Sequence, residues 1–318
     1  MPVSIVNTAT AKALDTSSFV RCIDELGNSA EKQGVSTEIF NKATAEIAPD
    51  MRIVARLDKQ PEFSLSRSAY LARQVTAERI RTGRTKMDEH RELLREIEAH
   101  YGVDPAILVA IWGMESSYGA AAGNVPVVQS LATLSCYGRR QSFFRNEFYS
   151  ALRILEEGDI KLNEFLGSWA GAFGQTQFLP SSFERLAVDY SGDGQRNVIG
   201  NISDALASAA NYLKDAGWQP GWPWGFAVSV PGGANATDYH WKDRNSLGFW
   251  KEQGVRRLDG SPLITAQLPA TTAAGLLASE DGAGSHFLVL TNFEALHRYN
   301  PAVNYALAIA SLAEHLRD

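Results

Sequence analysis

One carboxylic acid follows a long apolar stretch of this sequence and is the first residue that could do chemistry. Residues 106–114 are apolar, and Glu115 comes directly after them. Asp104 and Pro105 are typical of the first residues of a helix. Gly119 is typical of the residue just past a helix end. The pattern therefore predicts a buried helix that carries a single acid near its end.

Glu115 is a candidate general acid because of the residues that share its helix face. It lies three positions after Trp112 and seven after Leu108, which places it on an apolar face. Burial there is expected to raise the pKa of the carboxyl group. A glutamic acid that stays protonated near neutral pH can donate a proton to a leaving group. For a lone Glu at a helix end, an exposed or Arg-paired position is the alternative interpretation.

A second group of acidic residues has the spacing of a calcium loop. Residues 189–194 read D-x-S-x-D-G, which matches the first half of an EF-hand loop, including the glycine at the sixth position. The twelfth position, where a bidentate Glu belongs, is Gly200, and the next carboxylate is Asp204. The sequence thus indicates an atypical calcium loop or, alternatively, a turn rich in Asp and Gly.

Two further segments have side chains suited to binding a polar ligand. Residues 167–180 combine three glycines and two glutamines with aromatic residues. Glycine permits close backbone approach, and a glutamine amide both donates and accepts, which suits sugars and acetamido groups. Arg139 and Arg140 can bind an anionic group or act as surface charge, and their spacing alone leaves both interpretations open. Tyr70 is expected to face the core, with a groove-lining role as the alternative.

Length, composition and charge exclude several classes of protein. The chain has 318 residues, 45% of them hydrophobic, so two or three packed subdomains are expected. A net charge of −6 without a basic block argues against nucleic acid or anionic membranes as partners. No apolar run is long enough for a transmembrane helix, and the first ten residues lack the features of a signal peptide. Cys22 and Cys136 can form one disulfide or remain two thiols.

The hydrophobic spacing predicts a mainly helical chain with a small sheet. Short β-like runs are expected at 226–230, 263–268 and 286–291. Helices are expected as two short elements within 17–48, one or two long elements within 66–100, and single elements at 142–157, 203–217 and 305–316. Asn300 is a candidate cap for the last helix.

Several motifs together resemble one enzyme family. They are residues 111–119, 131–134 with 139–140, 167–182, 189–197, 209–213 with 216–218, and 298–300 followed by 305–308; 60–63 and 79–83 fit as well. The chain resembles the lytic murein transglycosylases of the membrane-bound lytic transglycosylase B type. The motifs occur in the order that this family has, and the similarity covers roughly residues 19–316.

This resemblance implies a fold and a division into domains. The expected class is mainly α (α+β), with a lysozyme-like helical core, an additional helical domain and a small β subdomain. The additional domain would comprise residues 1–100 and the C-terminal helix at about 292–318. The core would comprise 101–224, including the loop at 189–204, and the β subdomain would comprise 225–291.

The resemblance also implies a reaction. The family cleaves the β-1,4 bond between N-acetylmuramic acid and N-acetylglucosamine of peptidoglycan without water and forms 1,6-anhydro products. Such chemistry can use a single Glu as acid and then as base, whereas hydrolytic glycosidases usually need two carboxylates. A hydrolytic muramidase and a non-catalytic peptidoglycan-binding protein are the alternatives.

The site residues are carried over from the family by motif. Glu115 would be catalytic, and the substrate would be bound by Ser168, Gln177, Arg139, Arg140, Tyr212, Tyr299, Asn300, Tyr305 and, less directly, Tyr70. Calcium would be structural and held by Asp189, Ser191, Asp193, the Gln195 carbonyl and Asp204, while catalysis would need no cofactor. The expected partner is the peptidoglycan glycan strand, and the expected protein is a periplasmic monomer.

Overall fold

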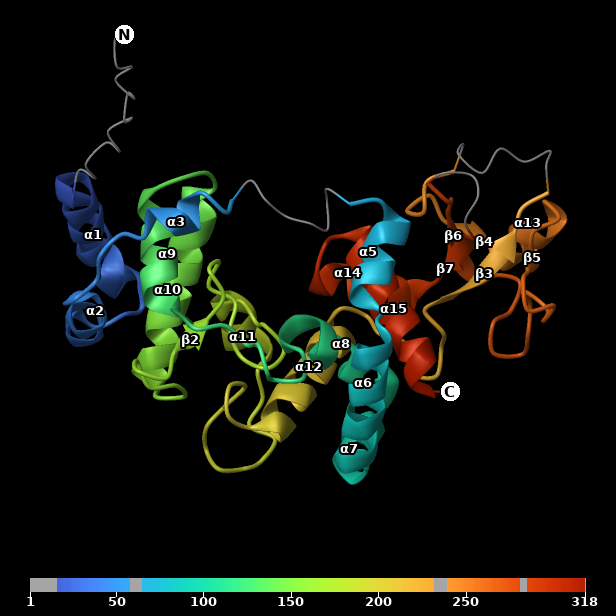
Figure 1. The fold of residues 1–318 in the computed structure, drawn as a ribbon, viewed down its shortest axis with the longest axis horizontal. Helices are drawn as coiled ribbons and strands as arrows, with labels where there is room; N and C mark the ends of the chain where they lie inside the picture. The colour runs from blue at the N-terminus through green and yellow to red at the C-terminus, as the bar shows by residue number, and fades with distance from the viewer. Residues whose placement is uncertain (1–15, 58–64, 232–238, 281–284, 318) are drawn as a thin grey trace, which may run out of the picture.

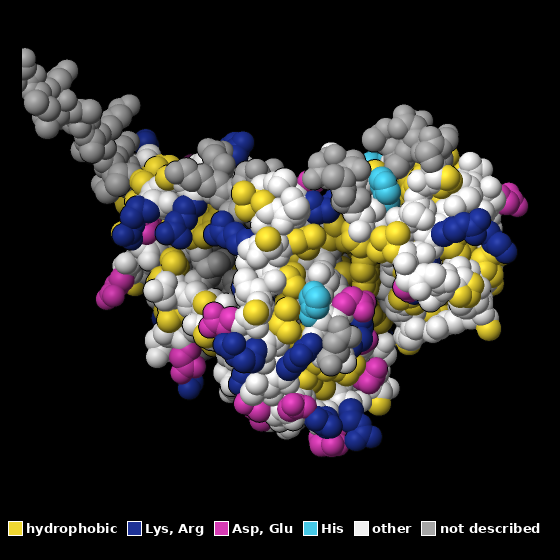
Figure 2. Space-filling view, turned by 45° about the vertical axis from the view of Figure 1, so that its right-hand side comes forward, with side chains coloured by type: hydrophobic (Ala, Val, Ile, Leu, Met, Phe, Trp, Pro, Cys, Tyr) yellow, Lys and Arg dark blue, Asp and Glu magenta, His cyan; other side chains and the backbone are white. Residues whose placement is uncertain are grey.

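The computed structural model describes residues 16–57, 65–231, 239–280 and 285–317, which form a mainly helical molecule with a small β region at one end (Figure 1). The expected mainly α (α+β) class is confirmed. In the described ranges no helix is long and apolar enough to cross a membrane. On the face drawn in Figure 2, Lys and Arg side chains are interspersed with Asp and Glu side chains.

The helix that carries Glu115 is the centre of the largest hydrophobic core. Helix α8 (Pro105–Ser116) begins where the sequence predicts, and Asp104 accepts a hydrogen bond from the amide of Ala106 at 2.8 Å. Residues 106–113 are all buried, because four neighbouring helices pack around α8. These neighbours are α6 (Ala77–Glu89), α7 (Arg91–Tyr101), α12 (Ile202–Asp215) and α15 (Val303–Arg317). Helices α5 (Arg67–Gln74) and α14 (Thr291–Tyr299) complete this part of the molecule.

A second core lies under the N-terminal helices. It is shared by the elements α1 (Thr16–Ala30), α2 (Thr37–Thr44), α3 (Met51–Val54), α9 (Val127–Cys136), α10 (Gln141–Glu157) and α11 (Pro180–Leu186). The first hundred residues are therefore divided between two cores, since α5, α6 and α7 pack with α8 and α15 instead. The division into domains inferred from the resemblance stays a prediction.

Cys22 and Cys136 form a disulfide, which resolves the two alternatives left by the sequence. It joins α1 to the last residue of α9 across a sequence separation of 114 residues. The N-terminal helix is thus attached covalently to the second core.

The third core is the β region. Its five short strands are antiparallel in the order β4-β6-β7-β3-β5. The strands are β3 (Gly225–Ser229), β4 (Asn245–Ser246), β5 (Arg256–Arg257), β6 (Ala273–Leu277) and β7 (His286–Val289), and α13 (Leu247–Glu252) packs beside them. The strands expected at 226–230 and 286–291 are confirmed as β3 and β7.

The strand expected at residues 263–268 is wrong. These residues form a turn in which the amide of Thr265 bonds the Leu268 carbonyl at 3.0 Å, and the Thr265 hydroxyl accepts from the Leu268 amide. Leu263 and Leu268 are buried from this turn, so their hydrophobic character reflects packing rather than a strand. The third long strand is β6 instead.

Three helix boundaries also differ from the sequence-based expectation. The region 66–100 contains three helices, because Thr76 caps the start of α6 and His90 interrupts the chain between α6 and α7. Helix α8 ends at Ser116, and the left-handed residue just past its end is Ser117 and not Gly119. Asn300 does not cap the last helix but follows the end of α14.

A close contact between two loops brings residues 123–126 beside the 167–180 segment. Strand β1 (Val125–Pro126) pairs with β2 (Leu166–Gly167). Gly123 has a φ of 98°, and a Cβ there would lie 2.2 Å from the Gly167 carbonyl oxygen. Only glycine permits this approach.

Gly123→Ala is expected to lower the free energy of unfolding by about 3 kcal/mol, through left-handed strain and displacement of the facing loop. Gly158→Ala is the matched control, because Gly158 has a φ of 81° and nothing within 4 Å of an added Cβ. It is expected to cost about 1 kcal/mol. Urea denaturation of both variants measures the difference, and equal losses would show that the loop contact contributes nothing.

Candidate active site

Glu115 lies in the wall of an open cavity of about 710 Å³. Its lining comes from the end of α8, the α9–α10 region, the 167–182 segment and the end of α14, with Tyr212 of α12 and Leu57, which follows α3. The lining residues are Leu57, Glu115, Arg139, Arg140, Phe143, Phe144, Trp169, Ala170, Ala172, Gln177, Phe178, Leu179, Ser182, Tyr212, Arg298, Tyr299, Asn300 and Pro301. Glu115 is the sole carboxylic acid among these described lining residues.

A buried tyrosine forms a hydrogen bond with the Glu115 carboxylate. The Tyr305 hydroxyl, on α15, donates a hydrogen bond to Glu115 Oε1. Tyr305 is buried and Tyr299 is partly buried, and the loss of solvation together with the nearby Glu115 charge raises both tyrosine pKa values well above their usual range. Both phenols therefore stay protonated and act as donors at neutral pH. The Tyr299 hydroxyl donates to the Thr176 carbonyl at 2.7 Å.

The two glutamines of the 167–180 segment have different positions. Gln175 accepts a hydrogen bond from the Trp112 indole N–H at 2.7 Å, which attaches the segment to α8. Gln177 lines the cavity, and its Nε2 donates to the Ala122 carbonyl at 2.8 Å and the Gly174 carbonyl at 2.9 Å. Gln177 has a φ of 51°, a left-handed backbone conformation, and it belongs to the same cavity lining as Glu115.

Ser168 and Tyr70 lie outside the cavity lining. The Ser168 hydroxyl accepts a hydrogen bond from the Ala172 amide at 3.1 Å, which fixes the turn of its own segment. Tyr70 is 4% exposed and faces the core, as the sequence analysis expected. The Tyr70 phenol is among the nearby groups that raise the pKa of Tyr305.

Aromatic rings form one side of the cavity. Tyr212 and Tyr299 have ring centroids 4.7 Å apart, and Phe178 contacts both rings edge-on. The Tyr212 hydroxyl donates to the Arg298 carbonyl at 2.8 Å. Asn300 lies at this side too. Such a surface can pack against the apolar faces of sugar rings while polar groups bind the hydroxyls.

The cavity also has a positively charged end. Arg139 and Arg140 are both exposed, and the Arg140 guanidinium lies 4.3 Å from the centre of the Phe143 ring. This position beside the cavity favours the anion-binding interpretation over simple surface charge.

Seven of the cavity-lining residues were predicted from the sequence, and several others were not. Missed residues with aromatic, charged or polar side chains are Phe143, Phe144, Trp169, Phe178, Ser182 and Arg298. Trp169 and Phe178 belong to the glycine-rich segment that was singled out, so their position in that segment was an available signal. Phe143 and Phe144 belong to α10, for which the sequence predicted only a helix.

The carboxylates predicted to bind calcium come together. Oxygens of Asp189, Asp193 and Asp204 lie within 4.8 Å of one another. Oxygen ligands of this kind fit calcium. Asp189 accepts hydrogen bonds from the amides of Gly192 and Gly194, at 2.7 and 2.8 Å, and these amides lower its pKa. Its carboxylate therefore stays ionised well into the acidic range.

Asp204 has a second set of partners. Its Oδ1 accepts from the amides of Tyr190 and Ser191 at 3.0 and 2.9 Å, and its Oδ2 accepts from the Asn197 amide at 2.9 Å. The side chain is fully buried. Asp204 therefore holds the loop together by accepting hydrogen bonds from its backbone amides. This role is additional to the predicted role of Asp204 as a calcium ligand.

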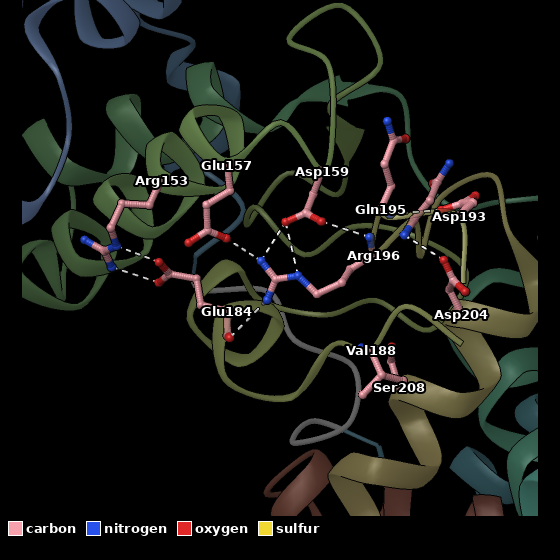
Figure 3. A network of polar contacts seen from close by, with 11 residues as sticks. Arg153, Glu157, Asp159, Glu184, Val188, Asp193, Gln195, Arg196, Asp204 and Ser208 are labelled. Atoms are coloured by element: carbon pink, nitrogen blue, oxygen red, sulfur yellow. Dashed lines mark hydrogen bonds and ion pairs between the residues drawn. The ribbon is translucent and has the colours of Figure 1, made fainter. Parts of the chain in front are cut away.

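A charged network attaches this loop to the end of α10 (Figure 3). The Arg196 guanidinium pairs with Asp159 at 2.6 Å and also with Glu157. The Arg196 amide donates to Asp159 as well, at 2.8 Å. The loop is thereby held to both cores, at α12 by Asp204 and at α10 by Arg196.

Comparison with known proteins identifies the family. The model of the transglycosylase SLT domain matches residues 18–314. This chain belongs to that family. Membrane-bound lytic murein transglycosylase B of Escherichia coli (strain K12) is 34% identical over 250 residues, which are 77% of this chain and 66% of that protein. The chain thus spans just under two thirds of that relative's length.

Solved structures agree with this membership. SltB3 from Pseudomonas aeruginosa, in complex with NAG-anhNAM-pentapeptide, is 41% identical with a TM-score of 0.89, and the match covers 94% of this chain and 79% of that chain. Escherichia coli Slt35 in complex with calcium is 28% identical with a TM-score of 0.79, covering 95% and 93%. These likenesses confirm the lysozyme-like fold expected from the sequence.

Proposed function

We propose that this protein is a lytic transglycosylase that cleaves the β-1,4 bond between N-acetylmuramic acid and N-acetylglucosamine in peptidoglycan glycan strands. Membership of the transglycosylase family and a groove-like cavity with Glu115 in its wall support this function. The observation that supports a non-hydrolytic reaction is that Glu115 is the single carboxylic acid among the described lining residues. A two-carboxylate hydrolysis would need a second acid across the cavity.

The proposed reaction uses Glu115 twice. Its carboxylic acid first protonates the leaving glycosidic oxygen while the C1–O bond of the muramyl residue breaks. The neighbouring acetamido oxygen stabilises the positive charge at C1. The Glu115 carboxylate then removes the proton from the muramyl 6-hydroxyl, whose oxygen bonds to C1 and closes the anhydro ring. Because nucleophile and electrophile belong to one sugar, the enzyme gains rate by holding them in a reactive orientation.

The surrounding residues would orient the glycan strand. Tyr305 positions Glu115 through its hydroxyl donor. Gln177 and Ser168 would hydrogen-bond the sugar and its acetamido group. Tyr212 and Tyr299 would contact the sugar faces.

Two further parts of the cavity would bind polar groups of the substrate. Asn300 would lie close to the reacting sugar at the end of α14. Arg139 and Arg140 would bind the lactyl or peptide carboxylates at the positively charged end, where bidentate guanidinium contacts are strong.

Product analysis tests the function. Purified peptidoglycan is digested with the protein, and the released muropeptides are analysed by mass spectrometry. Products lighter than hydrolysed muropeptides by one water are expected. Hydrated reducing ends would identify a muramidase instead, and no release from several peptidoglycans would favour a binding protein.

We also propose that the 189–204 loop binds a structural calcium ion through Asp189, Ser191, Asp193, the Gln195 carbonyl and Asp204. The oxygen-rich cluster of three carboxylates supports this assignment. Glu115 belongs to a different element, so calcium would support the fold and leave the acid–base chemistry to the protein.

Calcium is expected to raise the free energy of unfolding by about 2.7 kcal/mol when its free concentration is a hundred times the dissociation constant. Scanning calorimetry with calcium, and again with a chelator, measures this change. Asp189→Asn should abolish the increment, whereas magnesium at the same concentration should give little of it. An identical unfolding temperature with and without calcium would refute the assignment.

The remaining proposals concern location and assembly. A disulfide between Cys22 and Cys136 is typical of an oxidising compartment, which supports the periplasm, where peptidoglycan lies. We propose that the protein acts there as a monomer.

A further inference from the structure

The loop that carries Arg139 and Arg140 is short and has an unusual backbone. It connects Cys136, the last residue of α9, to Gln141, the first residue of α10. Two of its residues have left-handed conformations: Gly138 with a φ of 81° and Arg140 with a φ of 62°. A left-handed conformation costs a non-glycine residue about 1–2 kcal/mol. Contacts from outside the loop must therefore stabilise its conformation.

Helix α1 supplies such contacts, all to the two residues that precede Gly138. Cys22 is bonded to Cys136 through the disulfide. The Phe19 ring stacks on the Tyr137 ring, with centroids 6.1 Å apart and planes 9° apart. The Ser18 and Tyr137 hydroxyls form a hydrogen bond at 3.1 Å.

The three contacts come from a single face of α1. Residues three and four positions apart share a face of a helix, as Ser18, Phe19 and Cys22 do. They hold the chain immediately before Arg139 by a covalent bond, a ring stack and a hydrogen bond. Helix α10 also supports the loop, because the Gln141 side chain donates to the Cys136 carbonyl at 3.3 Å and the Arg140 guanidinium lies over the Phe143 ring. The residues that follow α3 lie against it as well, since a Cβ added to Gly138 would be 2.6 Å from Leu57 Cδ1.

Leu57, Arg139 and Arg140 line the same cavity as Glu115, whereas none of the described lining residues comes from α1. We propose that α1, cross-linked through Cys22–Cys136, positions the Arg139–Arg140 loop and thereby sets the affinity of the cavity for substrates that carry carboxylates. This inference rests on the proposed function, because it assumes that the arginine pair binds acidic groups of the glycan strand. Ser18, Phe19, Cys22, Cys136 and Tyr137 are positioning residues in this arrangement.

The inference differs from a purely stabilising role of the disulfide. A cross-link that closes a long loop stabilises the fold by about 2–4 kcal/mol in the usual case. If that were its whole effect, its removal would lower the unfolding temperature and leave the affinity of the folded protein unchanged for every ligand. A positioning role predicts a loss that is selective for acidic ligands.

The experiment compares two ligands by isothermal calorimetry well below each variant's unfolding temperature. The acidic ligand is a disaccharide pentapeptide of N-acetylglucosamine and N-acetylmuramic acid, and the neutral ligand is an N-acetylglucosamine tetrasaccharide. Cys22→Ser/Cys136→Ser removes the cross-link without leaving a reactive thiol. Leu26→Ala is the matched control, because Leu26 is a buried residue of α1 outside the contacts described above.

The Cys22→Ser/Cys136→Ser variant is expected to bind the acidic ligand about tenfold more weakly, which corresponds to ~1.4 kcal/mol, and the neutral ligand with unchanged affinity. Leu26→Ala is expected to lower the unfolding temperature without this selectivity. In an Arg139→Ala/Arg140→Ala background the same cysteine change should have no further effect on the acidic ligand, since coupled residues are not additive.

Equal changes for both ligands, or an undiminished effect in the arginine-free background, would overturn the inference. Unchanged affinity for the acidic ligand in the cysteine variant would overturn it as well. These binding measurements need no turnover. Absence of anhydro products from the wild-type protein would therefore refute the proposed function independently of them.

Discussion

Glu115→Gln is expected to lower kcat about a thousandfold while leaving KM and the unfolding temperature nearly unchanged. Glutamine has the size and shape of glutamic acid and can still accept the hydrogen bond from the Tyr305 hydroxyl. It has no proton to give to a glycosidic oxygen and cannot accept one from the muramyl 6-hydroxyl. Both halves of the proposed reaction therefore fail, which corresponds to a barrier increase of ~4 kcal/mol.

The measurement is the rate of anhydromuropeptide release from purified peptidoglycan, followed by mass spectrometry. Glu92→Gln is the control, because Glu92 is an exposed residue of α7 that forms an ion pair with Arg95 across one helical turn. It should retain full activity. A Glu115→Gln protein that still releases anhydro products at more than about a tenth of the wild-type rate would exclude Glu115 as the acid.

The helix that carries this residue could be predicted because its signals are local. Asp104, Pro105 and the apolar run determine where α8 begins and that it is buried, and the structure agrees. The run at 263–268 failed for the opposite reason. Its hydrophobic residues pack from a turn, which depends on contacts with the rest of the β region and not on the run itself.

The cavity could not be derived from spacing, because it is assembled by packing. Glu115, Arg139 and Tyr299 come from distant parts of the chain and meet only when α8, α9, α10 and α14 are in place. Motif resemblance identified these residues together, since a family's motifs preserve the result of such packing. The disulfide shows the same limit: two cysteines 114 residues apart give no local sign that they meet.

Asp204 illustrates what residue counting leaves out. The spacing suggested a ligand that completes an EF-hand-like loop. The structure places an oxygen of Asp204 near Asp189 and Asp193, and it also gives this side chain three backbone amide donors. Those donors come from the start and the middle of the loop, so Asp204 at its end connects these parts in a way that no count along the sequence reveals.

Asp204→Ala is therefore expected to lower the free energy of unfolding by about 5 kcal/mol in a chelator, and by more with calcium, where a proposed ligand is lost as well. Hydrogen bonds to a charged group contribute roughly 1.5–3 kcal/mol each, and the substitution leaves three amides without their acceptor in a buried place. Urea denaturation under both conditions measures the loss. Asp193→Asn is the matched control, because Asp193 is exposed and accepts only from the Gln195 amide among the hydrogen bonds described.

The two variants separate a metal ligand from a structural acceptor. Asp193→Asn should reduce the stabilisation by calcium and change little in chelator, since its amide oxygen can still accept the Gln195 N–H. Asp204→Ala should be destabilised in both conditions, because the amides of Tyr190, Ser191 and Asn197 need its carboxylate whether or not an ion is bound. If the Asp204→Ala loss vanished in chelator, its role would be that of a ligand alone, and the loop would depend on calcium for its closure.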